Sequence, residues 1–390
     1  MKLRYRILIG VGVLIALIAA SATVLLETEA GLHWAVARVE SLSNGAVKIG
    51  ATHGRLAGPL TLDNLRVTLP DDIIEVRHLE LDWHPLALIT GELHVVRLHG
   101  SGVRITTRPS KTPSKGLPQH LDLPLHIVID NAQFKQLALH TPNNNVQLNR
   151  LAFALDASDD VVKLDKLEAR GPRIALGGEV HTQPHGDWPV QARLALLLRL
   201  PDYPTVGGHT RLDGSLRGTL RLDQTLTTPF RAELKASVAN LFGTPSAHGT
   251  LHIAQLDPHA IKPDWPQLSA GTDLAFAGNL KDFTTHGTLT LTSPQAHTVR
   301  LNLEAGLDSQ RIRIKHLNLA LAGTPMRLAL HGTLQTTAPH NADLTLAWRH
   351  LRWPLQGTTP IASAAAGGAH LTGTIDQWTL ALRTLLKAHG

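Results

Sequence analysis

The feature that most constrains the fold is a two-residue alternation of apolar and polar side chains that returns along most of the chain. It is clearest over residues 212–222, where leucine or glycine stands at every even position and Asp, Ser, Arg or Thr at every odd one. A β-strand places alternate residues on opposite faces of a sheet, so the pattern predicts one apolar and one polar face. The rhythm recurs at 234–238, 287–291 and 301–307. The chain is therefore predicted to be mainly β.

Turn-forming residues such as Pro229 and Pro245 separate these runs at short intervals. Few connections could hold a helix, which disfavours a parallel βαβ architecture and favours an extended antiparallel sheet. Near copies of His-Gly-Thr-Leu occur at 248–251, 286–289 and 331–334. Weak repetition of this kind is typical of elongated folds.

An uncharged stretch at residues 7–26 predicts a membrane-spanning helix, because it is long enough to cross a hydrocarbon core of about 30 Å. The basic flank before it predicts a cytoplasmic N-terminus, with the rest of the chain on the far side. A cleaved signal peptide is the alternative, since Ala20-Ser21-Ala22 fits a signal peptidase site, although the apolar run continues past it. Both interpretations export the body of the protein. The residues assigned to the anchor are Ile7, Leu14, Ile18 and Leu26, and those assigned to its topology are Lys2, Arg4 and Arg6.

The exported part begins with a predicted helix from Thr28, as the cap, to about Ser43, after which helical periodicity nearly disappears. Its apolar residues, spaced to share one face, are Leu32, Val36, Val39 and Leu42. A segment rich in Pro, Ser and Lys follows later and has too few apolar residues to pack. The predicted divisions are a membrane anchor at 1–26, a helix with a β unit at 27–105, a linker at 106–120 and a repetitive β region at 121–390.

The sequence offers no recognisable reaction centre. With no cysteine, disulfides, thiolate zinc sites, iron–sulfur clusters and cysteine nucleophiles are excluded. The 23 histidines lack metal-ligand spacing and are predicted to be surface or rim residues, so no metal or cofactor is expected. The carboxylate pairs Asp71-Asp72 and Asp159-Asp160 lie in polar turns. We expect no enzyme; a β-helix carbohydrate-active enzyme is the best catalytic alternative.

The net charge of +6 could indicate an acidic partner. The basic residues are, however, scattered along the polar strand faces among acids and without an aromatic stacking platform. Nucleic-acid binding is therefore not expected.

The residues from 54 to 103 carry a family resemblance. They include Gly54-Arg55-Leu56-Ala57-Gly58-Pro59-Leu60, and then Trp83-His84-Pro85 with Gly91 before the next alternating run. Together with the anchor, the helix motif at 29–34 and Leu123-Pro124-Leu125, they resemble the N-terminal region of TamB proteins, the inner-membrane subunit of the translocation and assembly module within the AsmA-like group. The family-motif residues with a structural role are Gly58, Trp83, Pro85 and Gly91.

The resemblance implies a single-pass inner-membrane anchor and a long antiparallel periplasmic sheet, curled into a β-taco with an apolar groove. It implies work in outer-membrane biogenesis, with phospholipid moving between the membranes or outer-membrane proteins being assembled with a barrel partner. Family members are usually far longer and carry a C-terminal domain that meets this partner. The chain stops at Gly390, so we expect a truncated or divided member, which argues against direct docking to a barrel.

The leucine-rich, aromatic-poor strand faces favour an open groove that accepts acyl chains. The alternative is a closed sandwich or barrel with a filled core, which would make the protein a passive periplasmic scaffold. The residues predicted to line the groove are Leu212, Leu216, Leu220, Leu222, Leu234, Val238, Leu289, Leu291, Leu301 and Leu303.

Overall fold

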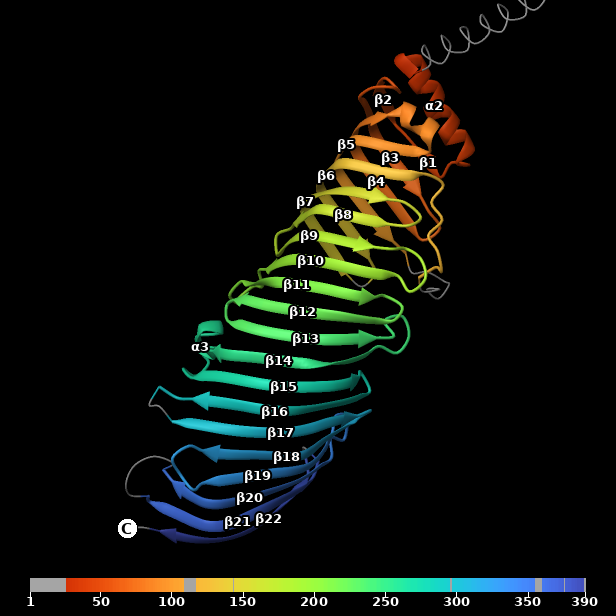
Figure 1. Cartoon of the computed structure of the whole chain (residues 1–390). Coiled ribbons are helices and arrows are strands. Elements are labelled where there is room, and N and C mark those ends of the chain that lie inside the picture. The colour runs from red at the N-terminus through yellow and green to blue at the C-terminus, as the bar shows by residue number, and fades with distance from the viewer. Residues whose placement is uncertain are drawn as a thin grey trace, which may run out of the picture. The chain divides into compact units, whose positions relative to one another are not determined.

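The structure is a computed structural model that is mainly β, as the alternating pattern predicts, and its strands are grouped in two compact units, Met1–Leu196 and Leu197–Gly390 (Figure 1). No helix among the described residues is long and apolar enough to span a bilayer. The anchor therefore stays a prediction: Ile7, Leu14 and Ile18, with Lys2, Arg4 and Arg6, lie outside the described residues. The residues that the structure describes are 26–108, 117–142, 144–294, 297–354, 360–374 and 376–388.

The first unit contains a helix, a 3-10 helix and the first strands. Its elements are α2 (Glu29–Leu42), β1 (Val47–Lys48), β2 (Ala51–Gly54), β3 (Leu60–Thr68), β4 (Asp72–His84), η1 (Pro85–Thr90), β5 (Glu92–Thr107), β6 (His126–Thr141), β7 (Asn144–Ala157), β8 (Val162–Arg170) and β9 (Ile174–Thr182), with β10 (Pro189–Leu198) at the division.

The second unit is a succession of strands with one short helix. Its elements are β11 (Val206–Ser215), β12 (Thr219–Thr228), β13 (Arg231–Ala239), β14 (Ser246–Leu256), α3 (Pro258–Ile261), β15 (Ser269–Asn279), β16 (Asp282–Thr292), β17 (Thr298–Asp308), β18 (Arg311–Leu321), β19 (Arg327–Gln335), β20 (Ala342–Trp353), β21 (Ala362–Gly373) and β22 (Trp378–Ala388).

The helix α2 begins as predicted, because the Thr28 hydroxyl accepts a hydrogen bond from the Gly31 backbone N–H at 3.2 Å. Its apolar face packs over only part of the predicted length. Leu32 is 2% exposed, whereas Leu42 at the other end is 68% exposed. Helical spacing therefore identified the apolar face of α2, but it did not predict that only the N-terminal part of this face is buried.

The Trp-x-Pro segment folds as predicted. β4 ends at His84, Pro85 opens η1, and Gly91 closes it in the left-handed conformation with φ of +80°. The indole of Trp83 donates a hydrogen bond to the Leu56 carbonyl at 2.8 Å, which ties β4 to the turn between β2 and β3. Gly58 lies in that turn, where its N–H donates to the Arg55 carbonyl.

The strands on either side of the predicted linker pair in parallel, which corrects the expectation of a wholly antiparallel sheet. β5 and β6 run in register from Glu92 opposite His126 to Thr106 opposite His140. A parallel pair needs a crossover of a dozen residues or more, and the segment between these strands is long enough to provide it. Thr106 and Thr107, the first residues of the predicted linker, belong to β5.

The end of that crossover is held by hydrogen bonds to later turns of the same unit. The indole of Trp188 donates to the Pro118 carbonyl at 2.9 Å, and the Leu121 N–H donates to the Pro184 carbonyl at 3.0 Å. The Leu123 N–H donates to Asp159 Oδ1 at 2.7 Å. Asp159 lies in a turn, as predicted, and there accepts a backbone hydrogen bond.

In the second unit each strand from β11 to β22 pairs antiparallel with the next. The run 212–222 is not one strand, as its alternation suggests, but a hairpin: Leu212 of β11 lies opposite Leu222 of β12. The turn forms because the Ser215 hydroxyl accepts a hydrogen bond from the Gly218 N–H at 2.9 Å. Leu216 is in this turn and not in a strand.

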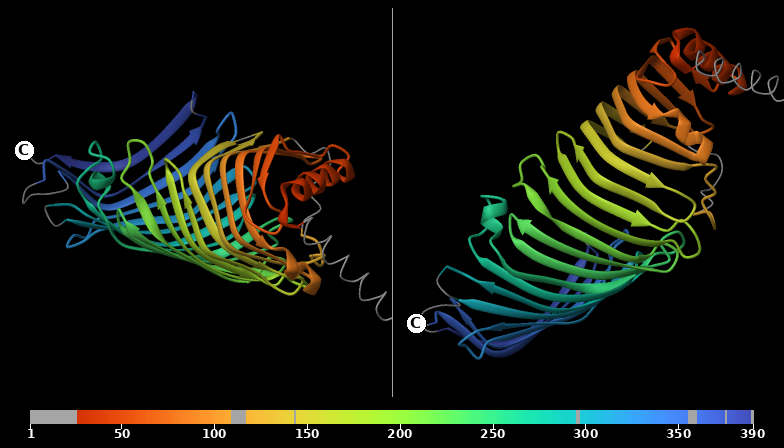
Figure 2. Two further views of the ribbon diagram at one scale, coloured as in Figure 1. Left: turned by 90° about the horizontal axis from the view of Figure 1, so that it is seen from above. Right: turned by 45° about the horizontal axis from the view of Figure 1, so that its top comes forward.

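The strands of each unit form a single layer and are bent along their length, as Figure 2 shows. Few side chains of the first unit are fully buried against the sheet. The buried cluster of the first unit consists of Val76, Val103 and Leu137, with partly buried apolar residues around it. The closed sandwich considered above would bury far more, so the described strands do not form one.

Candidate functional site

The candidate site is the apolar face of the sheet in the second unit. Strand register places one residue from each strand in a line that crosses the sheet perpendicular to the strands, and we call such a line a column. The central column is made almost entirely of leucine: Leu234, Leu251, Leu274, Gly287, Leu303, Leu317, Leu330 and Leu346. Neighbours within a column lie about 4.8 Å apart, so these leucines form an apolar line with one gap, at Gly287.

Most residues predicted to line a groove fall into this column or its neighbours. Leu234 and Leu303 belong to the central column. The others are paired as Leu212 with Leu222, Leu220 with Val238, Leu289 with Leu301, and Leu291 with Val299. Leu216 is the exception, because it lies in the turn after β11.

Burial separates the two faces of the sheet. The leucines of the columns are half-buried, whereas polar residues beside them in sequence, such as Arg221, Thr288 and Asn302, are exposed. Neighbouring side chains within a column cover part of one another, which agrees with the half-burial of the leucines. The leucines of the apolar face are thus less buried than residues of a closed core and less exposed than residues of an ordinary surface.

The polar face carries charges that complement one another. Glu304 of β17 lies between His286 and His316 in register, and the Lys315 ammonium binds its carboxylate at 2.5 Å. That hydrogen bond from Lys315 lowers the pKa of Glu304 below its usual value. Ion pairs of this kind make the polar face hydrophilic, as is usual for a protein surface. The apolar face is therefore the one whose composition suggests a binding function.

A network of histidine, carboxylate and lysine side chains crosses β6, β7 and β8. His126 Nε2 lies 2.7 Å from Asp156 Oδ1, and Lys163 Nζ lies 3.5 Å from the other oxygen of this carboxylate. The hydrogen bond from His126, assisted by Lys163, lowers the pKa of Asp156. Sequence spacing could not reveal these pairs because their members come from different strands.

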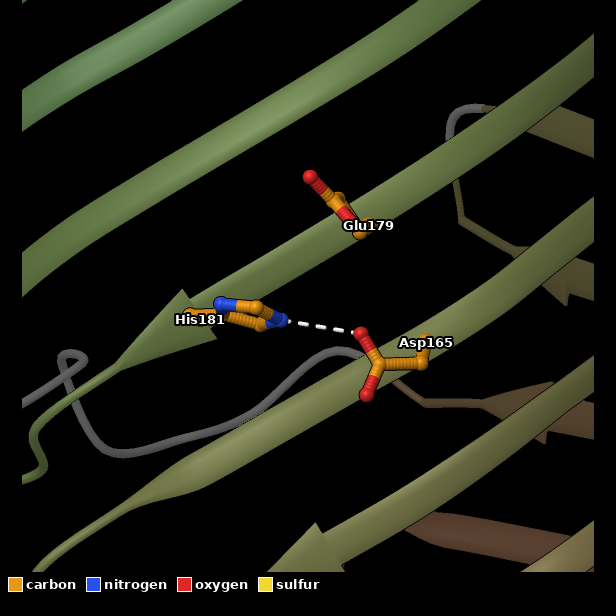
Figure 3. A group of neighbouring side chains, drawn as sticks. All are labelled: Asp165, Glu179 and His181. Atoms are coloured by element: carbon orange, nitrogen blue, oxygen red, sulfur yellow. Dashed lines mark hydrogen bonds and ion pairs between the residues drawn. The ribbon is translucent and has the colours of Figure 1, made fainter.

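One group brings together three possible metal ligands: Asp165 of β8 with Glu179 and His181 of β9 (Figure 3). Their ligand atoms lie within 4.8 Å of one another. Each side chain has a protein partner already, since His181 Nε2 lies 2.8 Å from Asp165 Oδ1 and Arg193 binds Glu179 at 3.0 Å. The same cross-strand pairing of histidine with carboxylate recurs elsewhere on the sheet, so an ordinary polar contact accounts for this group.

The sequence was then compared with known proteins. A family model described as the N-terminal domain of TamB matches residues 17–121 and 114–338, which is most of the chain. The chain belongs to the TamB family. The matched ranges contain Trp83, Pro85 and Gly91, which carried the resemblance. Comparison with curated proteins and with solved structures gives no significant match.

Within the TamB match lie the strands that carry the central leucine column as far as Leu330. The last strands, β20 to β22, follow the matched ranges and continue the same columns, with Leu346 opposite Ala369 and Ala369 opposite Leu382. The apolar face of this chain therefore begins within the matched residues and continues beyond them.

Proposed function

We propose that the apolar face of the sheet binds the acyl chains of phospholipids and gives them a path in outer-membrane biogenesis. The observation that carries this proposal is the half-buried column from Leu234 to Leu346, in which every residue except Gly287 is leucine. Membership of the TamB family and an open sheet agree with a groove for lipid or protein transport.

Lipid tails are a good chemical match to such a face. Removing a CH₂ group from water stabilises it by about 0.8 kcal/mol, so an acyl chain gains several kcal/mol along a column of leucines. The gain per group is nearly uniform from strand to strand, because the column repeats one residue type, so a chain can slide without meeting a deep trap. Such a face discriminates little between tails.

We further propose that the protein works from the inner membrane, held by the helix expected at residues 7–26, with its strands in the periplasm. Its partners would be phospholipid, the inner membrane and an outer-membrane barrel with which it would help to assemble outer-membrane proteins. It would act by binding and not by catalysis.

A passive scaffold is the second candidate, and burial argues against it. A scaffold with a closed β core would bury its leucines fully, as in ordinary cores. The column leucines named above are only half-buried. A β-helix enzyme would need parallel coils, whereas the described pairing is antiparallel apart from β5 with β6.

Adjacent residues of a strand lie on opposite faces of the sheet, which allows lipid binding to the two faces to be compared on the same strand. A photoreactive amino acid at Leu303 or Leu317 would lie on the apolar face, and one at the adjacent Asn302 or Asn318 would lie on the polar face. We expect phospholipid crosslinks in cells at the two leucine positions and few at the two asparagine positions. Mass spectrometry of the crosslinked protein identifies the lipid.

Each leucine position thus has a control one residue away on the same strand. Equal crosslinking at all four positions, or none at the leucines of a folded protein, would contradict the proposal. A protein ligand in place of lipid would appear as crosslinked bands of higher mass.

A further inference from the structure

The 3-10 helix η1, which joins β4 to β5, carries large apolar side chains on its surface. Leu86 is 69% exposed and Ile89 is 83% exposed. A 3-10 helix has three residues per turn, so these two side chains lie one above the other on the same side. The segment from Pro85 to Gly91 contains no ionisable residue. η1 therefore presents an exposed apolar side that no charge interrupts.

Hydrogen bonds hold the backbone of η1 at its C-terminal end. The Thr90 hydroxyl donates to the Ala87 carbonyl at 2.8 Å, and the Gly91 N–H donates to the Leu88 carbonyl at 3.1 Å. The Gly91 carbonyl accepts a hydrogen bond from the N–H of His126, the first residue of β6, at 3.0 Å. Because these carbonyls have partners, the turn can enter a region with little water without leaving them unpaired there.

The two ends of β4 differ in polarity. The turn before β4 contains Leu69 and Asp71, and the strand itself begins with Asp72. η1 follows the opposite end of the strand, at His84. The 13 residues of β4 span about 40 Å, so the two carboxylates lie far from η1. One end of the strand is therefore acidic, whereas the other continues into an apolar, uncharged turn.

Two hydrogen bonds connect the apolar end of β4 to Leu26, where the membrane helix expected at residues 7–26 ends. The Leu26 carbonyl accepts a hydrogen bond from the Ala57 N–H at 2.7 Å. The adjacent Leu56 carbonyl accepts one from the Trp83 indole at 2.8 Å. η1 begins two residues after Trp83. The turn between β2 and β3 therefore links the end of the expected membrane helix to the start of η1.

We infer that η1 inserts into the periplasmic surface of the inner membrane, with Leu86 and Ile89 between the lipid headgroups and the upper part of the acyl chains. A membrane helix that ends at Leu26 places the bilayer surface beside η1, and apolar side chains at such a surface are buried roughly 5–10 Å deep. This inference rests on the anchor of the proposed function. It adds a second membrane contact, which restricts how the first unit tilts and turns about a single membrane helix.

The chain contains no cysteine, so a single introduced cysteine can be labelled at one chosen site. The full chain with Ile89→Cys is labelled with the fluorophore NBD and reconstituted into liposomes of phosphatidylethanolamine and phosphatidylglycerol, with or without lipid that carries a nitroxide near the headgroup. We expect the nitroxide lipid to lower the fluorescence of the probe at residue 89 about twofold, because a side chain at this depth meets the quencher.

Leu69→Cys is the matched control, because Leu69 is also an exposed leucine in a turn of the first unit but lies at the acidic end of β4. Its probe should keep its fluorescence. Leu86→Asp, added to the chain labelled at residue 89, should lower the quenching to the level of this control, because a carboxylate resists transfer out of water. Leu69→Asp should leave the quenching at residue 89 unchanged. Both leucines are exposed, and circular dichroism checks that the variants are folded.

The outcomes separate this inference from the proposed function. Flotation of the liposomes reports the anchor: if the full chain does not float with them, the anchor is wrong and the inference fails with it. If the chain floats but the probe at residue 89 is quenched no more than the probe at residue 69, η1 does not insert and the anchor stands. Unchanged quenching after Leu86→Asp refutes the insertion in the same way. The groove is tested separately by the crosslinks at Leu303 and Leu317, which do not depend on η1.

Discussion

At the scale of single residues, histidine is the residue that most often bridges strands on the polar face. His78 lies 2.7 Å from Asp63, His126 lies 2.7 Å from Asp156, and His370 lies 2.7 Å from Asp343. In each pair the partners come from adjacent strands. These histidines therefore tie neighbouring strands together through side-chain contacts in addition to the backbone hydrogen bonds of the sheet.

The pair of His78 and Asp63 gives a direct test. Hydrogen bonds to Asp63 and then to Glu80 raise the pKa of His78. Replacing Asp63 with Asn removes the larger cause, so we expect the pKa of His78 to fall towards 6.5. An NMR titration of the His78 ring measures it. No fall in Asp63→Asn, or an equal fall in a distant control such as Asp213→Asn, would contradict the assignment.

The direction of these shifts defines a pH window. Because the pKa of His78 is raised in the fold, its stabilising contribution is complete below about 6.5 and is lost as pH rises through the folded value. Because the pKa of Asp156 is lowered, its contribution is complete above about 4 and is lost as pH falls. Both contributions are present together between about pH 4 and 6.5.

The glycines of the repeated His-Gly-Thr-Leu motifs have a physical reason. A Cβ at Gly332, where φ is +144°, would lie 2.0 Å from the Asp343 carbonyl oxygen of the neighbouring strand. Gly249 and Gly287 face the carbonyls of Lys235 and Asp273 in the same way. The motif therefore marks places where two strands approach too closely for any side chain.

Gly332→Ala should accordingly destabilise the fold by more than about 1 kcal/mol, since strain and a backbone clash act together. Chemical denaturation followed by circular dichroism measures the change. Gly243→Ala is the control, because the nearest atom to its Cβ position is 3.9 Å away. Equal effects from the two substitutions would mean that the close approach is not the cause.

At the scale of elements, the sequence predicted well what is decided locally. The cap of α2 at Thr28 and the turn from Pro85 to Gly91 depend on neighbouring residues, and both were found. The alternation at 212–222 was assigned to one strand. In the hairpin, Leu212 and Leu222 pair and lie on the same face, so the two-residue period of leucines is the same as in a single strand. The turn is set by the hydroxyl of Ser215, which the hydrophobic pattern does not record.

The parallel pair of β5 and β6 was missed for a different reason. Direction of pairing depends on where a connection carries the chain, and the linker gave no local sign of a return to the same end of the sheet.

At the scale of the whole molecule, the two units have separate sets of internal contacts, so damage to one should remain local. Leu137 belongs to the buried cluster of the first unit. We expect Leu137→Ala to weaken that unit by about 2–4 kcal/mol through the cavity that it leaves. Hydrogen exchange with mass spectrometry should show faster exchange in β4 to β7 and unchanged exchange in β17 to β21. Equal acceleration in both groups would mean that the chain unfolds as one cooperative body.

The next-neighbour order of pairing from β11 to β22 has a consequence for how the protein is made. Each strand from β12 onwards finds its partner in residues already synthesised, so this part can form hairpin by hairpin from its N-terminal end. In the first unit, by contrast, one edge of β5 stays unpaired until β6 has been synthesised after the intervening crossover. During that interval the unpaired edge of this long strand could pair with another chain, so it is the stage of biosynthesis at which a chaperone would be needed.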